Sequence, residues 1–277
     1  MTSGAEVGGA SRASRVAVER ALGEVADDSS ADLAAVGDEL LAVVRLLDSE
    51  HGLRRTLSDA TSSADGRREM VGALLDGKVS AATLRIVQAA VSERWARAGD
   101  LADALERAAV FALVGSVDRD GSDVAIEDEL FRFARIVDGT AGLRRALSDA
   151  AAPADSKRAL VRDLLGDQVS GVTARLADEA ATHLRGRSVE GALQGYARMV
   201  AARRRELIAH VVTAVALSDE HRERLATTLA RQYGRQVHLD IEVDPGIGGG
   251  IRVQVGDDLI DGTVNSRLAD ARRRLAG

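Results

Sequence analysis

The sequence has no cysteine, only two prolines, and aromatic residues at 2% of its 277 positions. Without cysteine the chain has no disulfide, no thiolate metal site and no cysteine nucleophile. So few prolines allow long, uninterrupted helices. The core has to be built from Leu, Val, Ile and Ala, because large aromatic side chains are scarce. No apolar run reaches about 18 residues, so the sequence predicts no membrane-spanning helix.

What remains is typical of a packed globular protein of two or three domains, with 45% hydrophobic and 29% charged residues. The net charge of −6 argues against a nucleic-acid-binding protein. The first 28 residues lack the apolar core of a secretory signal and carry too many acids for a transit peptide. We therefore expect a soluble, cytoplasmic protein.

An internal duplication with an offset of 90 residues is the strongest pattern. DELLAVVRLLDSEHGLRRTLSDA at 38–60 recurs without a gap as DELFRFARIVDGTAGLRRALSDA at 128–150. The correspondence continues to 85 and its counterpart 175, and about half of the positions in this stretch are identical. A period this long indicates a duplicated domain-sized unit rather than a solenoid repeat of about 20–50 residues.

The apolar spacing within each copy is helical. Ser80 and Ser170 are suited to cap the helices that follow them. Each copy is interpreted as a bundle of about five or six short helices. The helical stripes consist of Val36, Leu40, Val43, Val44 and Leu47 in the first copy, and of Ile126, Leu130, Phe133, Ala134 and Val137 in the second.

Near residue 207 the periodicity changes. The apolar run 210–217 predicts a buried strand, and Ser218 caps a helix that extends to about Tyr233. Alternation over 237–244 and 251–255 predicts two more strands, and 266–275 predicts a last helix. The expected fold class is therefore mainly α, with two homologous helical bundles followed by a small β-α-β-β-α unit. The expected domains are 1–100, 101–206 and 207–277.

No catalytic, cofactor-binding or metal-binding site is predicted. The glycine run 246–250 is followed by a strand, whereas a phosphate-binding loop needs a following helix and a Lys-Ser/Thr pair. None of the five histidines stands in a metal-ligand pattern, and no serine lies in a nucleophile elbow.

The stretch EVDPGIGGGIRVQVGDDLIDGTV at 242–264 resembles the signature of the δ subunit of F-type ATP synthases, the oligomycin sensitivity-conferring protein of mitochondria. Segment 143–170 is also similar to that family. The resemblance is close over about 104–277 and looser before it. An ordinary member has one helical bundle, so the family does not imply what the extra copy binds. The signature residues here are Gly249, Gly250, Gly256, Asp257, Asp261 and Gly262.

The resemblance implies a non-enzymatic subunit of the peripheral stalk, present in one copy per complex and without a cofactor. It implies binding to the N-terminal helix of an α subunit and to the b-subunit stalk, with the β subunit as a further candidate contact. It implies no nucleic-acid partner. The location implied is the cytoplasmic face of the bacterial plasma membrane, as a peripheral subunit of the complex.

The helix expected at 101–117 is apolar on two faces. Such a helix is either central in its bundle or contributes one face to an interface. In the family, the groove for the α-subunit helix is lined by this helix and by a later one, here placed within 188–206. Because small side chains let another helix approach closely, the candidate partner-binding residues are Leu105, Ala109 and Ala112.

Two hypotheses from other classes stay open at this point. The first is a generic α-helical adaptor that takes no part in energy coupling. The second is a hydrolase whose site is assembled only by the fold, which a deep polar pocket with a strongly perturbed acid or histidine would favour.

Overall fold

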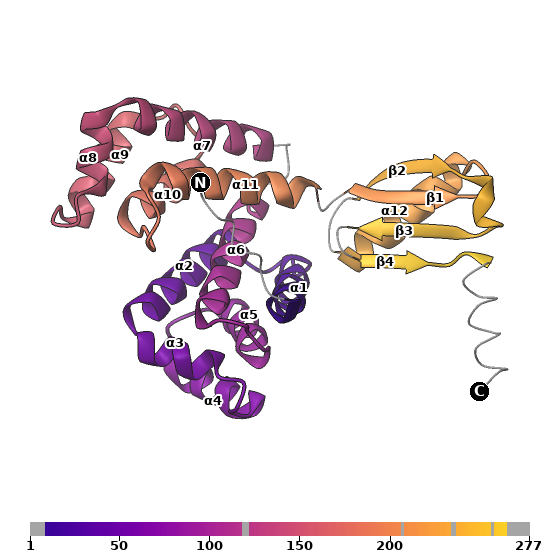
Figure 1. The fold of residues 1–277 in the computed structure, drawn as a ribbon, viewed down its shortest axis with the longest axis horizontal. Coiled ribbons are helices and arrows are strands. Elements are labelled where there is room, and N and C mark those ends of the chain that lie inside the picture. The colour runs from indigo at the N-terminus through magenta and orange to yellow at the C-terminus, as the bar shows by residue number, and fades with distance from the viewer. Residues whose placement is uncertain (1–8, 118–121, 206–207, 234–236, 256–257, 265–277) are drawn as a thin grey trace. The chain divides into compact units, whose positions relative to one another are not determined.

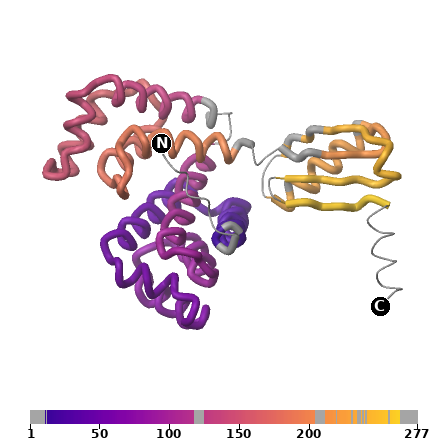
Figure 2. The backbone as a smooth tube through the Cα atoms, viewed as in Figure 1, coloured from indigo at the N-terminus to yellow at the C-terminus, as the bar shows by residue number. Residues whose placement is uncertain are grey.

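The computed structural model describes residues 9–117, 122–205, 208–233, 237–255 and 258–264. The chain divides into two compact units, Met1–Ala201 and Ala202–Gly277 (Figures 1 and 2). The first unit is helical and the second contains a sheet. The predicted fold class, mainly α with a small C-terminal α/β unit, is confirmed.

The described helices of the first unit follow one another with short connections. They are α1 (Gly9–Ala26), α2 (Leu33–Ser49), α3 (His51–Ser58), α4 (Ala64–Leu75), α5 (Ala81–Ser92), α6 (Ala98–Gly115), α7 (Ser122–Gly139), α8 (Ala141–Ser148), α9 (Ala154–Leu165), α10 (Gly171–Thr182) and α11 (Val189–Arg205).

The duplication is visible in the limits of these helices. Helices α8, α9 and α10 begin and end 90 residues after α3, α4 and α5. With the same offset, α6 corresponds to α1 and α11 corresponds to α6, each within one residue at either end. Helix α6 is therefore both the last helix of a first repeat, α1–α6, and the first helix of a second repeat, α6–α11. The expected boundary at residue 100 falls inside this shared helix, so the domain limits stay a prediction.

The predicted apolar stripes form the core of both repeats. All ten side chains of the two stripes are at most 5% exposed, and they belong to one continuous hydrophobic cluster. The cluster runs from α1 to α11, so the two repeats share a single core.

Equivalent capping sites hold the start of α5 and of α10. The Ser80 hydroxyl accepts the Thr83 N–H, and the Ser170 hydroxyl accepts the Thr173 N–H, as predicted. A glutamate of α2 completes the first site, and the equivalent glutamate of α7 completes the second. The Glu39 carboxylate accepts the Ser80 N–H at 2.9 Å and the Ser80 hydroxyl at 2.7 Å. Glu129 accepts the Ser170 N–H at 3.1 Å.

The capping site predicts an acid-sensitive contribution to stability. Burial raises the pKa of Glu39, but hydrogen bonds from Thr83 and Ser80 outweigh burial and bring it below 4.5. Stabilisation is then fully present above the unfolded-state pKa and is lost as the pH falls through the lowered pKa. We expect Glu39→Gln to lose about 1 kcal/mol of unfolding free energy at pH 7 and less below pH 4. Urea titrations at both pH values measure this, and an equal loss at both would contradict it.

The second unit is a mixed sheet with one described α-helix and a short 3-10 helix, η2 (Pro245–Ile247). Strand β1 (Ile208–Thr213) pairs in parallel with β2 (His238–Val243) and antiparallel with β3 (Ile251–Val255), which pairs antiparallel with β4 (Asp258–Asp261). The strand order is β2-β1-β3-β4. Helix α12 (Asp219–Tyr233) joins β1 to β2, and Leu229 packs with Val211, Val253 and Val255 in the small core.

The strand predictions are partly corrected by this sheet. The first strand was expected at 210–217, but β1 ends at Thr213, whose hydroxyl donates to the Val215 carbonyl at 2.7 Å. Val215 is consequently 71% exposed, outside the sheet. Strand β4 was not predicted, because four exposed residues at a sheet edge have no apolar alternation to detect. The helix expected at 266–275 lies outside the described residues.

Candidate functional site

Helix α6, the helix expected at 101–117, is buried over almost its whole length. Its buried residues lie on all faces and include two acids, Asp100 and Glu106. The candidate residues Leu105, Ala109 and Ala112 are at most 1% exposed. In this structure they offer no free surface.

The chain itself covers the alanine-rich stripe of α6. Helix α2 approaches so closely at Gly37 that a Cβ atom there would lie 2.5 Å from Leu113 Cγ and 3.1 Å from the Ala109 carbonyl oxygen. Helix α6 also packs against α1, α3, α5 and α10. These contacts favour the central-helix alternative. Partner binding at Leu105, Ala109 and Ala112 stays an untested prediction.

The burial of Ala112 predicts a large loss of stability on substitution. Ala112→Arg places a long charged side chain in a filled core, so we expect it to lower the unfolding free energy by roughly 3 kcal/mol or more. Ala73→Arg, on an exposed position of α4, should change it by less than about 0.5 kcal/mol. Chemical denaturation of both variants checks this. A stable Ala112→Arg variant that fails to bind an α-subunit helix would restore the interface hypothesis.

A network of charged side chains centres on Glu106, whose side chain is 3% exposed. Glu106 Oε2 accepts from Arg185 Nη1 at 2.7 Å, and Glu106 Oε1 accepts from Arg187 Nη2 at 2.6 Å and from the Tyr196 hydroxyl at 3.0 Å. Arg185 also donates to Asp48 at 2.6 Å and to Asp103 at 2.9 Å. The network therefore joins α2, α6, α11 and the connection between α10 and α11.

The surroundings of this network keep its members in fixed protonation states. Burial raises the pKa of Tyr196, and the nearby Glu106 carboxylate raises it further, so the hydroxyl stays a donor. Burial alone would lower the pKa of Arg185, but Glu106, Asp103 and Asp48 outweigh burial and raise it. Arg185 has a positive φ of 50°, which is unfavourable for a non-glycine residue. Its three carboxylate partners hold it there. The arrangement is structural rather than catalytic.

Ion pairs also join helix α2 to α10 of the second repeat. Asp38 is 3.7 Å from Arg175, Arg45 donates to Glu179 at 2.7 Å, and Asp48 binds Arg185 just after α10. These α2 residues recur at helical spacing on one side of the helix. In the second repeat, the α6–α10 pair is thus covered by a helix of the first repeat.

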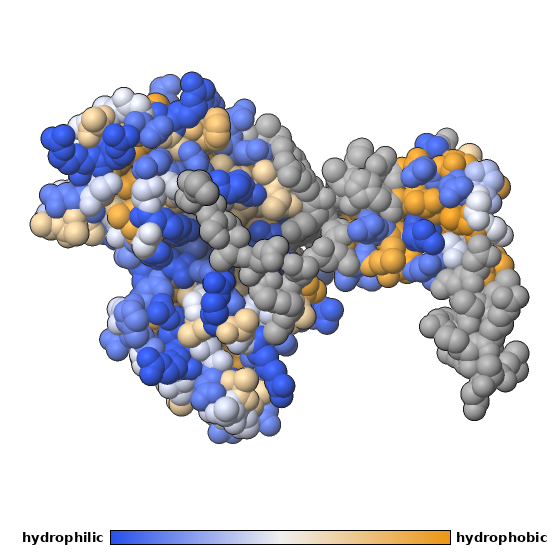
Figure 3. Space-filling model, in the orientation of Figure 1, coloured by the Kyte–Doolittle hydropathy of each residue, from blue (hydrophilic) through white to orange (hydrophobic). Residues whose placement is uncertain are grey.

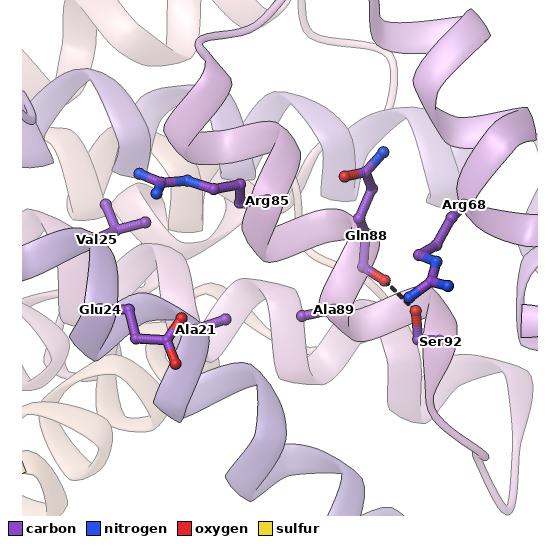
Figure 4. A pocket seen from close by; sticks show the side chains of 8 residues that line it. All are labelled: Ala21, Glu24, Val25, Arg68, Arg85, Gln88, Ala89 and Ser92. Atoms are coloured by element: carbon purple, nitrogen blue, oxygen red, sulfur yellow. Dashed lines mark hydrogen bonds between the residues drawn. The ribbon is translucent and has the colours of Figure 1, made fainter. Parts of the chain in front are cut away.

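The equivalent pair in the first repeat, α1 and α5, is open. A cavity of ≈ 310 Å³ is lined by α1, α5 and Arg68 of α4 (Figure 4). Its α5 residues Arg85 and Ala89 occupy the positions that Arg175 and Glu179 occupy on α10. The residues that line it are Ala21, Glu24, Val25, Arg68, Arg85, Gln88, Ala89 and Ser92. This mixture of small, apolar and charged side chains is suited to binding a helix rather than to catalysing a reaction.

Sites for other functions are not found in the part of the chain that the structure describes. Among these residues, no three acids or histidines come together as a metal site. No described helix combines the length and apolarity needed to cross a bilayer.

The glycine-rich signature shapes the second unit. Gly249 and Gly250 have φ values of 121° and 85°, and a Cβ on Gly250 would lie 2.5 Å from the Gly262 carbonyl oxygen. Asp261 accepts the N–H and the hydroxyl of Thr263 at 3.0 and 2.7 Å, and these bonds lower the pKa of Asp261. The signature residues therefore build a tight crossing of two loops. Gly256 and Asp257 lie outside the described residues.

Apolar side chains are exposed on the second unit. Leu259 and Ile260 of the edge strand β4 are 59% and 40% exposed, and Val264 beyond it is 44% exposed. Figure 3 shows apolar surface on the visible face of this unit. Exposed apolar residues that cluster at a sheet edge are typical of an interaction surface.

Together, a groove-bearing helical unit and a small α/β unit with an exposed apolar edge define a two-part binding protein without a described catalytic centre. The model of the ATP synthase delta (OSCP) subunit family matches residues 108–275. The chain is 46% identical to ATP synthase subunit delta of Kineococcus radiotolerans over 97% of this chain and 98% of that protein. The subunit of Thermobifida fusca is also 46% identical, over 97% and 99%.

The chain belongs to the ATP synthase delta (OSCP) subunit family, which comprises a non-catalytic subunit of the complex. A third relative, ATP synthase subunit delta of Streptomyces avermitilis, is 43% identical over 97% of this chain and 98% of that protein. Because these matches cover almost the whole chain, the relatives extend over the first repeat as well. The family model itself begins only at 108, within α6.

Proposed function

We propose that this chain is a stator subunit that links the catalytic head of an F-type ATP synthase to its peripheral stalk, so that proton-driven rotation is coupled to ATP synthesis. Family membership over nearly the full chain is the observation that carries this proposal. The division into two units supports it, since a linker needs two separate contact surfaces. The protein would act as a peripheral subunit at the cytoplasmic face of the plasma membrane.

The contacts have to resist rotational load. Each proton that crosses about 150 mV delivers roughly 3.5 kcal/mol to the rotor. Nanomolar binding corresponds to about −12 kcal/mol, and a helix that buries its apolar face in a groove can reach this affinity. A helical groove is therefore a suitable anchor for the head.

The α1–α5 groove is the place where we expect the N-terminal helix of an α subunit to bind. The equivalent α6–α10 pair is covered by α2, which pairs Asp38 with Arg175. An occupant of the open groove should likewise present an acid to Arg85, the counterpart of Arg175. We favour this placement over the α6 stripe, whose residues Leu105, Ala109 and Ala112 are buried within the chain.

Charge reversal in the groove tests this assignment. We expect Arg85→Glu to weaken binding of a synthetic α-subunit N-terminal peptide by about tenfold, through repulsion of its acidic residues. The matched control is Arg55→Glu, on an exposed position of α3. Titration calorimetry with both variants measures the affinities. An unchanged affinity for Arg85→Glu would exclude the groove.

The second unit is the part that we expect to contact the b-subunit stalk. Its exposed apolar residues are Leu259 and Ile260, on opposite faces of β4, and Val264 beyond the strand, and they are candidate contacts for an amphipathic stalk helix.

Removal of the second unit separates the two proposed contacts. A chain that ends at residue 205, the last residue of α11, should retain binding to the catalytic head and lose binding to b. Co-purification of tagged truncated and full-length chains with the other subunits measures both contacts. If the truncated chain still bridges head and stalk, the proposed division of roles is wrong.

A further inference from the structure

One side of α7 repeats the chemistry that α2 uses to bind the second repeat. The α2 side consists of Asp38, Leu41, Arg45 and Asp48. At the same four positions, 90 residues later, α7 has Asp128, Phe131, Arg135 and Asp138. The charges are identical, and an aliphatic residue is replaced by an aromatic one.

The two sides differ in what covers them. Leu41 is 3% exposed, whereas Phe131 is 51% exposed. The Asp48 side chain is 27% exposed beside Arg185, whereas that of Asp138 is 68% exposed and, among the described residues, pairs with Arg144 of its own repeat. Within the described residues, Arg135 has no carboxylate partner, whereas its counterpart Arg45 binds Glu179 at 2.7 Å. The α7 side is thus a complete but uncovered version of an interface that the chain already contains.

We propose that this side of α7, Asp128–Phe131–Arg135–Asp138, is a second docking surface for an amphipathic helix of a partner protein. It is separate from the α1–α5 groove and does not depend on the function proposed for that groove. The charged residues that pair with α2 within this chain indicate which residues the partner helix should carry. Helix α10 and its following turn present Arg175 to Asp38, Glu179 to Arg45 and Arg185 to Asp48.

The occupant therefore carries two basic residues that flank an acid. The acid pairs with Arg135, and the bases approach Asp128 and Asp138. Small or apolar side chains between them leave room for Phe131, which supplies more contact area than the leucine of α2. Phe and Arg are both enriched at protein interfaces, which commonly have an apolar centre and a polar rim.

A peptide with the sequence of residues 171–187 of this chain is the probe, because it contains the complete Arg-Glu-Arg pattern. Its fluorescence anisotropy is measured on titration with the intact chain. We expect saturable binding, about tenfold weaker for Phe131→Asp and for Arg135→Glu. A peptide with Glu179→Arg should regain affinity for the Arg135→Glu chain, since the charge pair is then restored in reverse.

The control variant separates this surface from others. Arg145→Glu, on an exposed position of the neighbouring helix α8, should bind the peptide as the unaltered chain does. Circular dichroism confirms that the surface variants fold. Absence of binding, or equal binding by Phe131→Asp, overturns the proposal. Self-association that Phe131→Asp abolishes would also overturn it, in favour of a second copy as the occupant.

Discussion

The buried carboxylate of Glu106 is the contact on which the helical unit depends. A carboxylate that is 3% exposed has to be neutralised, and two arginines from the α10–α11 connection do so. One of them, Arg185, also binds Asp48 of α2. The Glu106 carboxylate on α6 therefore holds the α10–α11 connection in place. Arg185 of this connection also links the second repeat to α2 of the first. Loss of both arginines would leave the Glu106 carboxylate buried without a charged partner, a situation that costs about 3–5 kcal/mol.

Much of the fold could be predicted from the sequence because its determinants are local. Apolar stripes at helical spacing mark the buried faces of α2 and α7, and Ser80 and Ser170 mark the starts of α5 and α10. The duplication predicted that both copies fold alike. The first strand was predicted to extend to residue 217 because 214–217 is apolar, but apolarity alone does not distinguish a strand from the loop that follows it. The edge strand β4 depends on its pairing with β3, which local sequence does not encode.

The candidate site could be predicted only in part. The two apolar faces of α6 were visible, but which of them contacts a partner depends on where α2 packs. Some positions at which the two copies differ nevertheless indicated where the repeats contact each other. Ala89 corresponds to Glu179 and Trp95 to Arg185, and both charged members lie at the contact between the repeats. The α2 and Arg175 members of this contact are identical in both copies, so only the diverged charges Glu179 and Arg185 distinguish the contact from the common fold.

The shared helix α6 also limits how such a chain can change in length. Because one helix serves both repeats, two repeats need eleven helices rather than twelve, and a further repeat would add five helices. A deletion of the first 97 residues would uncover Ala109, Leu113 and the rest of the face that α2 now protects. A change in the number of repeats that keeps the register of the shared helix therefore alters the length of the chain in steps of 90 residues.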